Sequence, residues 1–287
     1  GVVGAVEISS EAGFDKIIGF DMGGTSTDVT HYAGEYERAF ETLVAGVRMR
    51  APMMQIHTVA AGGGSICAFD GSRYRVGPES AGANPGPASY GKGGPLTVTD
   101  CNVMLGKLQP DYFPAIFGPN QDKVLNRQIV HEKFKNLSDE IHSSTGDSRS
   151  PLEVADGFLQ IAVENMANAI KKISVQRGYD VSEYSLCAFG GAAGQHACLV
   201  ADALGMTSVI AHPMAGVLSA YGMGLADVRA LREQSVEKLL TKDNIHEAQK
   251  ILERLSIEAI EEVKAQSISE TNIETVCNLH LKYDGTD

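Results

Sequence analysis

Short apolar runs separated by glycine-rich turns fill the first hundred residues. Residues 16–21 and 28–32 are rich in β-branched and aromatic side chains, and a Gly/Ser/Thr segment lies between them. This pattern predicts two strands joined in a hairpin. Gly71 marks a second turn, after which residues 73–76 are expected to return as a strand. We therefore expect a glycine-rich α/β sheet with functional loops in this part.

Helical periodicity replaces this pattern after about Thr99. Ser150 and Glu153 have the spacing of a capping box, and Pro151 stands at the first helical position. Apolar residues then recur at helical spacing as far as Gly178. These signals together predict one long helix.

A strand–helix–strand unit follows the long helix. Residues 184–189 form a short apolar run, and the glycine turn at residues 190–194 leads into a helix that ends near Gly205. Residues 208–211 form another apolar run. A βαβ unit of this kind predicts parallel strands with a right-handed crossover.

The last part of the chain predicts one more helix and one more strand. Residues 243–267 carry an apolar stripe that we expect to pack on the sheet, with a helix that binds a partner as the alternative. Residues 279–283 alternate between apolar and polar and predict a half-buried strand. The expected organisation is a glycine-rich part at residues 1–137, a possible linker at 138–150 and a helical/βαβ part at 151–287, interlocked in one domain.

Composition and charge narrow the functional classes. No run of about 18 uninterrupted apolar residues occurs, so we expect no membrane-spanning helix. With 24 Lys and Arg against 36 Asp and Glu, the formal net charge of −12 disfavours nucleic acid as a partner. Five scattered cysteines without a Cys-x-x-Cys pair favour reduced thiols and a cytoplasmic location. Residues 1–10 lack a signal-peptide pattern and an initiator Met, so we expect the chain to be a piece of a longer gene product.

The first candidate site is a glycine turn between two carboxylates. Asp21 ends the first predicted strand and Asp28 begins the second. Glycines let backbone N–H groups approach a phosphate, hydroxyls add donors, and carboxylates can hold a hydrated Mg²⁺ ion. An ordinary tight hairpin is the alternative. The candidate ATP-binding residues of this turn are Gly23, Gly24, Thr25, Ser26 and Thr27.

A second glycine turn lies between a predicted strand and a predicted helix. Such a turn presents free N–H groups and the positive end of a helix dipole to an anion or a nucleotide. Its Gly-Gly-x-x-Gly spacing matches neither the dinucleotide-binding motif nor the Walker A motif, which disfavours both. A turn that needs glycine only for close helix packing is the alternative. The candidate residues on the adenosine side are Gly190, Gly191, Ala192 and Gly194.

In this order and about 160 residues apart, the two turns resemble the second phosphate-binding hairpin and the adenosine motif of the actin, sugar kinase and Hsp70 ATPase superfamily. The resemblance narrows to the hydantoinase A and 5-oxoprolinase family. It implies an α/β fold, namely one actin/Hsp70-like ATPase half of the ribonuclease H-like type, with a mixed sheet and flanking helices. The stretches that carry the resemblance are residues 21–29, 57–66, 76–88, 97–102 and 189–197.

The resemblance also implies cofactors and partners. Asp21 and Asp28 would hold Mg²⁺, residues 23–27 would hold the phosphates of ATP, and residues 190–194 would contact its adenosine side. Family members carry a further hairpin of this type on an N-terminal segment, and only one such hairpin occurs here. We therefore expect the central part of a longer subunit, which needs its N-terminal half to bind nucleotide well. A hydantoinase B-type subunit or domain would be a further partner.

The activity implied by the resemblance is ATP-dependent hydrolysis of a cyclic amide, such as a hydantoin or 5-oxoproline. ATP would phosphorylate the amide oxygen before the ring opens, with Asp21 and Asp28 as catalytic residues. In phosphoryl transfer the protein mostly positions groups and neutralises charge. Two alternatives remain open: a subunit of an ATP-dependent ketone carboxylase, and a non-catalytic actin-like nucleotide switch. The part of the subunit present here is expected to be inactive alone.

Weaker candidates lie outside these two turns. His57, Asp100 and His196 could supply metal ligands or a general base, and a hydrogen-bonded structural role is the alternative for each. Glu79 and Asn84 are expected in a Pro/Gly loop that is too long for an ordinary turn. Such a loop favours a role on the substrate side or as a lid. A rigid scaffold is the alternative.

Overall fold

The structure is a computed structural model that describes residues 1–44 and 47–283. Residues 1–225 form one compact unit, and the chain from residue 226 onward forms a second. Every candidate site residue lies in the first unit. None of the helices in the described ranges combines the length and the apolar character that crossing a bilayer requires.

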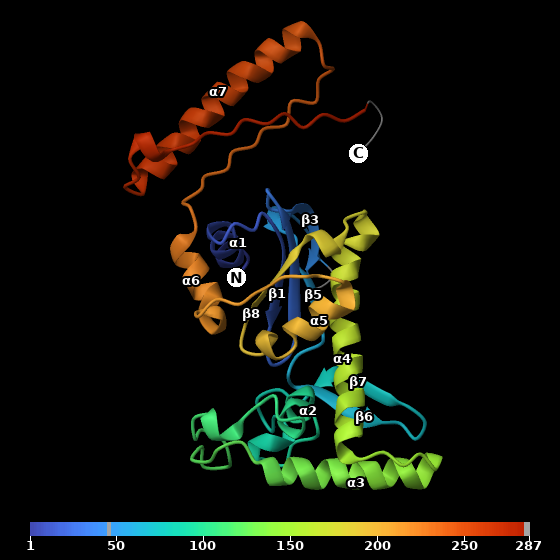
Figure 1. Ribbon diagram of the computed structural model, residues 1–287. Helices are drawn as coiled ribbons and strands as arrows, with labels where there is room; N and C mark the ends of the chain where they lie inside the picture. The colour runs from blue at the N-terminus through green and yellow to red at the C-terminus, as the bar shows by residue number, and fades with distance from the viewer. Residues whose placement is uncertain (45–46, 284–287) are drawn as a thin grey trace. The chain divides into compact units, whose positions relative to one another are not determined.

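A five-stranded mixed sheet forms the centre of the first unit (Figure 1). Its strand order is β5-β2-β1-β8-β9. Strand β2 is antiparallel to β1 and β5, whereas β8 is parallel to β1 and β9. The predicted α/β class with a mixed sheet is therefore confirmed. The strands are β1 (Lys16–Met22), β2 (Thr27–Ala33), β5 (His57–Val59), β8 (Ser185–Phe189) and β9 (Val209–Ile210).

Helices cover both faces of this sheet (Figure 1). Because successive side chains of a strand point to opposite faces, Ile18, Phe20 and Met22 of β1 enter one core and Ile17 enters another. Asp21 shares the face of Ile17. Each large apolar side chain that is fully buried in this way stabilises the fold by about 1.5–3 kcal/mol. Helices α4 (Pro151–Ile173) and α5 (Ala197–Leu204) contact the first face, and α1 (Val2–Glu11) and α6 (Leu218–Leu225) the second.

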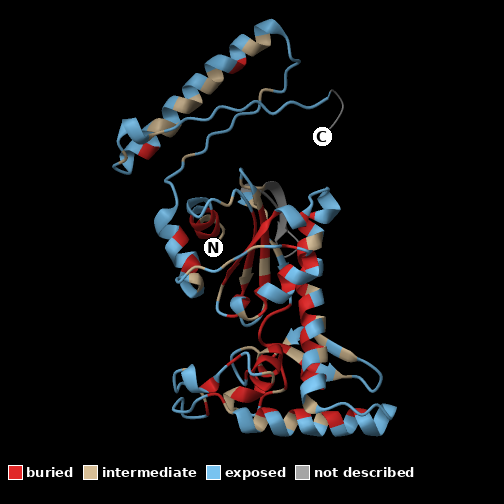
Figure 2. Cartoon of the chain, viewed as in Figure 1, coloured by how far each residue is buried: buried red, intermediate tan, exposed pale blue. Residues whose placement is uncertain are grey.

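Helix α4 begins where the sequence predicts. The Ser150 N–H donates to the Glu153 carboxylate at 2.8 Å, and the Glu153 N–H donates to the Ser150 hydroxyl at 3.3 Å, which completes the capping box. Buried residues recur from one end of α4 to the other (Figure 2). This long helix joins the sheet to a smaller layer of helices and a hairpin. Tyr74 in that hairpin stacks on Phe158 of α4 with ring centroids 4.6 Å apart.

The smaller layer and the connections complete the first unit. The layer comprises β6 (Ser65–Phe69), β7 (Tyr74–Ser80), α2 (Val98–Met104) and α3 (Arg127–Thr145). A separate antiparallel hairpin consists of β3 (Arg38–Val44) and β4 (Val47–Met54). Short 3-10 helices are η1 (Ala88–Tyr90), η2 (Pro110–Tyr112), η3 (Val175–Arg177), η4 (Val181–Glu183), η5 (Ala193–Gln195) and η6 (Ala215–Val217).

The local predictions for the first unit agree with these elements. The hairpin of β1 and β2, the strand pair around Gly71 and the parallel strands of the βαβ unit are confirmed. Residues 138–145 belong to α3, and the remainder up to Ser150 is a loop. A linker function for residues 138–150, and the division of the chain at that point, stay predictions.

The second unit contains one long helix, α7 (Lys242–Ala265), and the short η7 (Glu270–Asn272). The Thr241 hydroxyl caps α7 by accepting the Asn244 N–H at 3.3 Å. The helix is confirmed, and its packing on the sheet stays a prediction. The strand predicted at residues 279–283 is wrong, because the described residues there have no regular structure and Leu281 is 62% exposed. Alternation forms a strand only beside another strand, and the described part of this unit has none.

Candidate functional site

Two carboxylates lie opposite each other in the β1–β2 hairpin. Asp21 and Asp28 are cross-strand partners, so their side chains share the face of the sheet that α1 and α6 cover. Burial, together with the negative charge of Asp28, raises the pKa of Asp21 above its ordinary value. Like charges at opposed positions destabilise a sheet unless a positive group lies near them. The pair is therefore suited to bind a cation.

The turn between the two aspartates is closed at its base and exposed at its tip. The Gly23 N–H donates to the Ser26 carbonyl at 3.0 Å. The Thr27 hydroxyl is buried and donates to the Ala61 carbonyl, in the loop that follows β5. Gly24 and Thr25 are exposed. This turn combines the small residues and the hydroxyl donors that a phosphate site uses.

Three consecutive glycines, Gly62 to Gly64, form the loop that supports this turn. A Cβ atom on Gly62 would lie 2.6–2.7 Å from backbone atoms at the tip of the turn, so a larger residue would displace it. The Gly63 N–H donates to the Gly23 carbonyl at 3.1 Å, and the Gly64 N–H donates to the Gly24 carbonyl at 2.6 Å. These glycines are not among the predicted site residues, although a run of three glycines in the sequence is itself a signal of close backbone packing.

The second glycine turn meets the carboxylates at the ends of β1 and β8. Gly190 has φ +85°, and a Cβ atom there would lie 2.4 Å from Oδ1 of Asp21 and 2.6 Å from the carbonyl oxygen of Met22. Only glycine fits this position without strain and displacement. The Ala192 N–H donates to the same Met22 carbonyl at 2.9 Å. The structure thus brings the two predicted motifs together.

The meeting point is a topological switch in the sheet. After β1 the chain turns to β2 on one side, and after β8 it passes through α5 to β9 on the other side. Ligands of open α/β sheets bind in the crevice at the carboxyl ends of strands where the chain diverges in this way. The carboxyl ends of β1 and β8 carry Asp21 and Gly190 there.

A third segment, residues 215–219, also reaches this point. The Ala215 carbonyl accepts the Gly190 N–H at 2.9 Å. A Cβ atom on Gly1 would lie 3.0 Å from Oγ of Ser219 and 3.3 Å from Oδ2 of Asp21, so α6 begins close to the carboxylate. This segment was not predicted from the sequence, where the available signal was Gly216, five residues after the strand predicted at residues 208–211.

Asp100 and His57 lie in different surroundings from each other. The buried carboxylate of Asp100 accepts the N–H groups of Ala88, Ser89 and Thr97 at 2.8–3.0 Å and the Thr97 hydroxyl at 3.0 Å. Its contacts with Thr97 cap α2, which is a structural role of the kind given above as the alternative for Asp100. Burial lowers the pKa of His57, which lies in β5. Among the residues that the structure describes, no group of three or more His, Cys, Asp or Glu side chains could hold a metal ion. Metal or base roles for both residues stay predictions.

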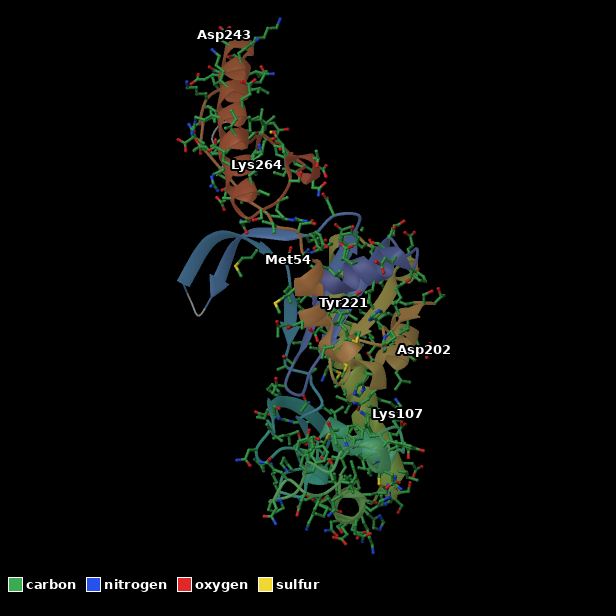
Figure 3. All side chains as sticks on the ribbon, turned by 90° about the vertical axis from the view of Figure 1, so that its left-hand side faces the viewer. Met54, Lys107, Asp202, Tyr221, Asp243 and Lys264 are labelled. Atoms are coloured by element: carbon green, nitrogen blue, oxygen red, sulfur yellow. The ribbon has the colours of Figure 1, made fainter. Side chains whose placement is uncertain are left out.

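His196 is fully buried at the start of α5. Its Nε2 atom lies 3.1 Å from the Asn102 amide, which also donates to the Gln195 side chain at 2.8 Å. The ammonium of Lys107, labelled in Figure 3, donates to the Gln195 carbonyl at 3.0 Å. Burial, and secondarily the charge of Lys107, lowers the pKa of His196 to about 4, so the ring is neutral at pH 7. These contacts tie α2 to the residues that follow the glycine turn.

Glu79 and Asn84 are both exposed. Asn84 lies in a loop, as expected, but the loop position predicted for Glu79 is wrong. Strand β7 extends through Ser80 because Ser80 pairs with Ser65 across the β6–β7 hairpin, and Glu79 is therefore a strand residue. A role on the substrate side stays a prediction for both residues.

The donors at the carboxyl edge of β1 and β8 fit Mg²⁺ and the phosphates of ATP. Mg²⁺ is usually bound by one or two carboxylates together with phosphates of the substrate, and Asp21 and Asp28 form such a pair. A Cβ atom on Gly24, Gly191 or Gly194 would meet nothing within 4 Å, so there is open space beside the backbone of both turns. Phosphate oxygens need that space to approach backbone N–H groups.

Comparison with known families gives a match over most of the chain. The model of the family described as Hydantoinase/oxoprolinase matches residues 1–232. The 5-oxoprolinase of Saccharomyces cerevisiae is 44% identical over 294 residues, which cover 100% of this chain and 23% of the yeast protein. The chain therefore spans less than a quarter of the length of that relative.

Two solved structures have a similar fold. One is the nucleotide-free structure of acetone carboxylase, which is described in terms of ATP-dependent acetone carboxylation. Its TM-score is 0.72 at 26% identity, and the match covers 94% of this chain and 38% of the acetone carboxylase chain. The other is the ATP-dependent caprolactamase from Pseudomonas jessenii. Its TM-score is 0.68 at 31% identity, and the match covers 92% of this chain and 36% of the caprolactamase chain. Both proteins are thus described as acting with ATP.

Proposed function

Because this chain belongs to the hydantoinase/oxoprolinase family, we propose that it forms the ATP-binding part of an ATP-dependent hydrolase of cyclic amides. The observation that carries this proposal is the contact of the Asp21 carboxylate with Gly190, which joins a cation-binding pair to a glycine turn at the switch point of the sheet. Similarity to a 5-oxoprolinase and to a caprolactamase supports a cyclic amide as the substrate.

Each part of the site has a chemical role in this proposal. Asp21 and Asp28 hold Mg²⁺, which neutralises the negative charge that develops on the transferred phosphoryl group. The turn at residues 23–27 binds the phosphates through backbone N–H groups and hydroxyls. The turn at residues 190–194 binds the adenosine side. The γ-phosphoryl group passes to the amide oxygen and ADP leaves. One water molecule then attacks the activated carbon, the C–N bond breaks with the amine as leaving group, and an open-chain acyl phosphate results. A second water molecule hydrolyses this acyl phosphate to the carboxylate and free phosphate.

The proposed site needs further parts of the protein. We propose that a second phosphate-binding hairpin on an N-terminal segment closes the cleft over ATP, and that a hydantoinase B-type subunit or domain completes ring opening. The similarity to caprolactamase, of which a chain named subunit alpha is 37% identical over 77% of this chain, supports such an assembly. A cytoplasmic location also belongs to this proposal, and the five free cysteines support it.

The test is ADP release by the intact protein with its partner, supplied in turn with 5-oxoproline, hydantoin, caprolactam, and acetone plus bicarbonate. We expect one of the cyclic amides to stimulate ADP release and to be hydrolysed. Asp21→Asn should lower kcat/KM by at least about a hundredfold, since the substitution removes charge from the phosphoryl-transfer site. Asp202→Asn is a matched control, because Asp202 is an exposed carboxylate on α5 (Figure 3). Equal rates for Asp21→Asn and the wild type would contradict the proposal.

A second candidate function is a subunit of an ATP-dependent ketone carboxylase. The fold similarity to acetone carboxylase favours it specifically. In the same assay, this function requires ADP release that depends on both acetone and bicarbonate and on none of the cyclic amides. ATP-dependent filament formation without turnover of any of these compounds would instead support an actin-like switch.

A further inference from the structure

A threonine on the neighbouring strand contacts the carboxylate pair. Thr58 in β5 is the cross-strand partner of Asp28, and Asp28 is the partner of Asp21. The three residues therefore form one row across β5, β2 and β1 on the same face of the sheet. The Thr58 hydroxyl donates to Oδ1 of Asp28 at 2.6 Å.

This hydrogen bond constrains the direction of the Asp28 carboxylate. At 2.6 Å it is a short bond between a hydroxyl and an ionised acceptor, which is stronger than a bond between neutral groups. Without this donor, Asp28 could rotate about its side-chain torsions at little cost, because it is only partly buried. With one oxygen held by Thr58, the carboxylate keeps a fixed orientation beside Asp21.

We propose that Thr58 is a positioning residue that orients Asp28 toward the cation and phosphates of the site. The inference rests on the proposed function, since it assigns Thr58 a part in that same site. Thr58 is exposed, so its hydroxyl is not needed to satisfy a buried group. Its hydrogen bond with Asp28 therefore adds little to folding, and its contribution is to preorganise the site.

Two substitutions separate the hydroxyl from the strand that carries it. Thr58→Val keeps the β-branched shape that suits a strand and removes the donor. Thr58→Ser keeps the donor and removes the methyl group. Thr207→Val is the matched control, because Thr207 is an exposed threonine of the same unit in the loop between α5 and β9.

The experiment measures Mn²⁺ binding to the intact protein by electron paramagnetic resonance, with a non-hydrolysable ATP analogue present, alongside kcat, KM and the melting temperature. We expect Thr58→Val to weaken Mn²⁺ binding and lower kcat by about tenfold, as for loss of a hydrogen bond to a charged group, with little change in melting temperature. Thr58→Ser should recover both to within about twofold of the wild type, and Thr207→Val should leave them unchanged.

Each other result overturns the inference. Mn²⁺ binding by Thr58→Val at wild-type strength means that the hydroxyl does not orient Asp28. An equal loss in Thr58→Val and Thr58→Ser means that the methyl group or the strand matters, and not the donor. If the wild type binds no Mn²⁺ with the nucleotide analogue, the proposed function fails, and the role of Thr58 fails with it. That outcome is recognised from the wild type alone.

Discussion

Gly190 lies against Asp21, so that a Cβ atom on residue 190 would stand 2.4 Å from Oδ1 of the carboxylate. The contact follows from the sheet. Asp21 in β1 is paired with Phe189 in the parallel strand β8, and the residue after Phe189 must pass beside Asp21. Two motifs that are far apart in the sequence are therefore parts of one site.

Replacing Gly190 with alanine should disrupt this site. Alanine at φ +85° costs about 1 kcal/mol of backbone strain, and the displacement of Asp21 and Met22 adds about 1–3 kcal/mol. We expect the free energy of unfolding, measured by urea denaturation, to fall by about 2–4 kcal/mol. Calorimetry should show at least about tenfold weaker binding of a non-hydrolysable ATP analogue to the intact protein, because the carboxylate moves.

The control for this substitution is Gly205→Ala. Gly205 also has a positive φ, +69°, but a Cβ atom there would meet nothing within 4 Å. This variant should lose only the free energy of the backbone strain, and it should bind the nucleotide analogue as the wild type does. Equal destabilisation of the two variants would show that the contact with Asp21 imposes no constraint.

Gly62→Ala should loosen the phosphate turn from behind. Its Cβ atom would lie 2.6–2.7 Å from backbone atoms of Thr25 and Ser26, which cannot move aside as the end of a flexible side chain can. We expect faster amide hydrogen exchange at residues 23–27 and about tenfold weaker nucleotide binding. Gly224→Ala in α6, where a Cβ atom would meet nothing within 4 Å, should change neither quantity. Unchanged exchange in Gly62→Ala would refute the supporting role of the triple glycine.

The helices and strands that carry the site were predictable from the sequence, whereas the contacts between them were not. The β-branched runs on both sides of the first glycine turn were sufficient to predict the β1–β2 hairpin, and the capping box at Ser150 predicted the start of α4. The βαβ pattern predicted that β8 and β9 are parallel. Local signals are reliable here because each element buries its own apolar face in one of the two cores.

Contacts between distant segments were not predictable in the same way. Pairing of β8 with β1 brings Gly190 to Asp21. The sequence of neither strand indicates which other strand it will pair with. The support of the turn by Gly62 and the approach of Ala215 also depend on tertiary packing. Residues 279–283 illustrate the converse, since their alternation predicted a strand and the described chain supplies no partner strand in that unit.

Asp21→Asn should stabilise the protein while it abolishes cation binding. The pKa of Asp21 is raised in the fold, so the ionised carboxylate costs stability at pH 7 and the cost disappears below its ordinary value of 3.8. Without metal we therefore expect the variant to have a higher free energy of unfolding than the wild type at pH 7, and the difference to shrink as the pH falls toward 3.8. Adding Mg²⁺ with the ATP analogue should raise the melting temperature of the wild type only. A melting temperature that rises equally in both would contradict the role of Asp21.

The buried ring of His196 should make the stability depend on pH in a defined window. Its pKa is about 4 in the fold against an ordinary value of 6.5, so the folded state disfavours the protonated ring. The stabilisation is complete above pH 6.5 and is lost as the pH falls toward 4. Over that window the unfolded state binds one more proton than the folded state, which lowers the free energy of unfolding by roughly 3 kcal/mol.

Urea denaturation at intervals between pH 7 and pH 4 measures this dependence. His196→Gln should be less stable at pH 7, because the cavity and the contact with Asn102 change, but its stability should fall less steeply with decreasing pH. His131→Gln removes an exposed histidine of α3 and should keep the wild-type slope. Since other groups titrate equally in all three proteins, the difference in slope isolates the ring of His196. Identical slopes for His196→Gln and the wild type would mean that the ring takes up its proton at the same pH in the folded and unfolded states, so that burial does not lower its pKa.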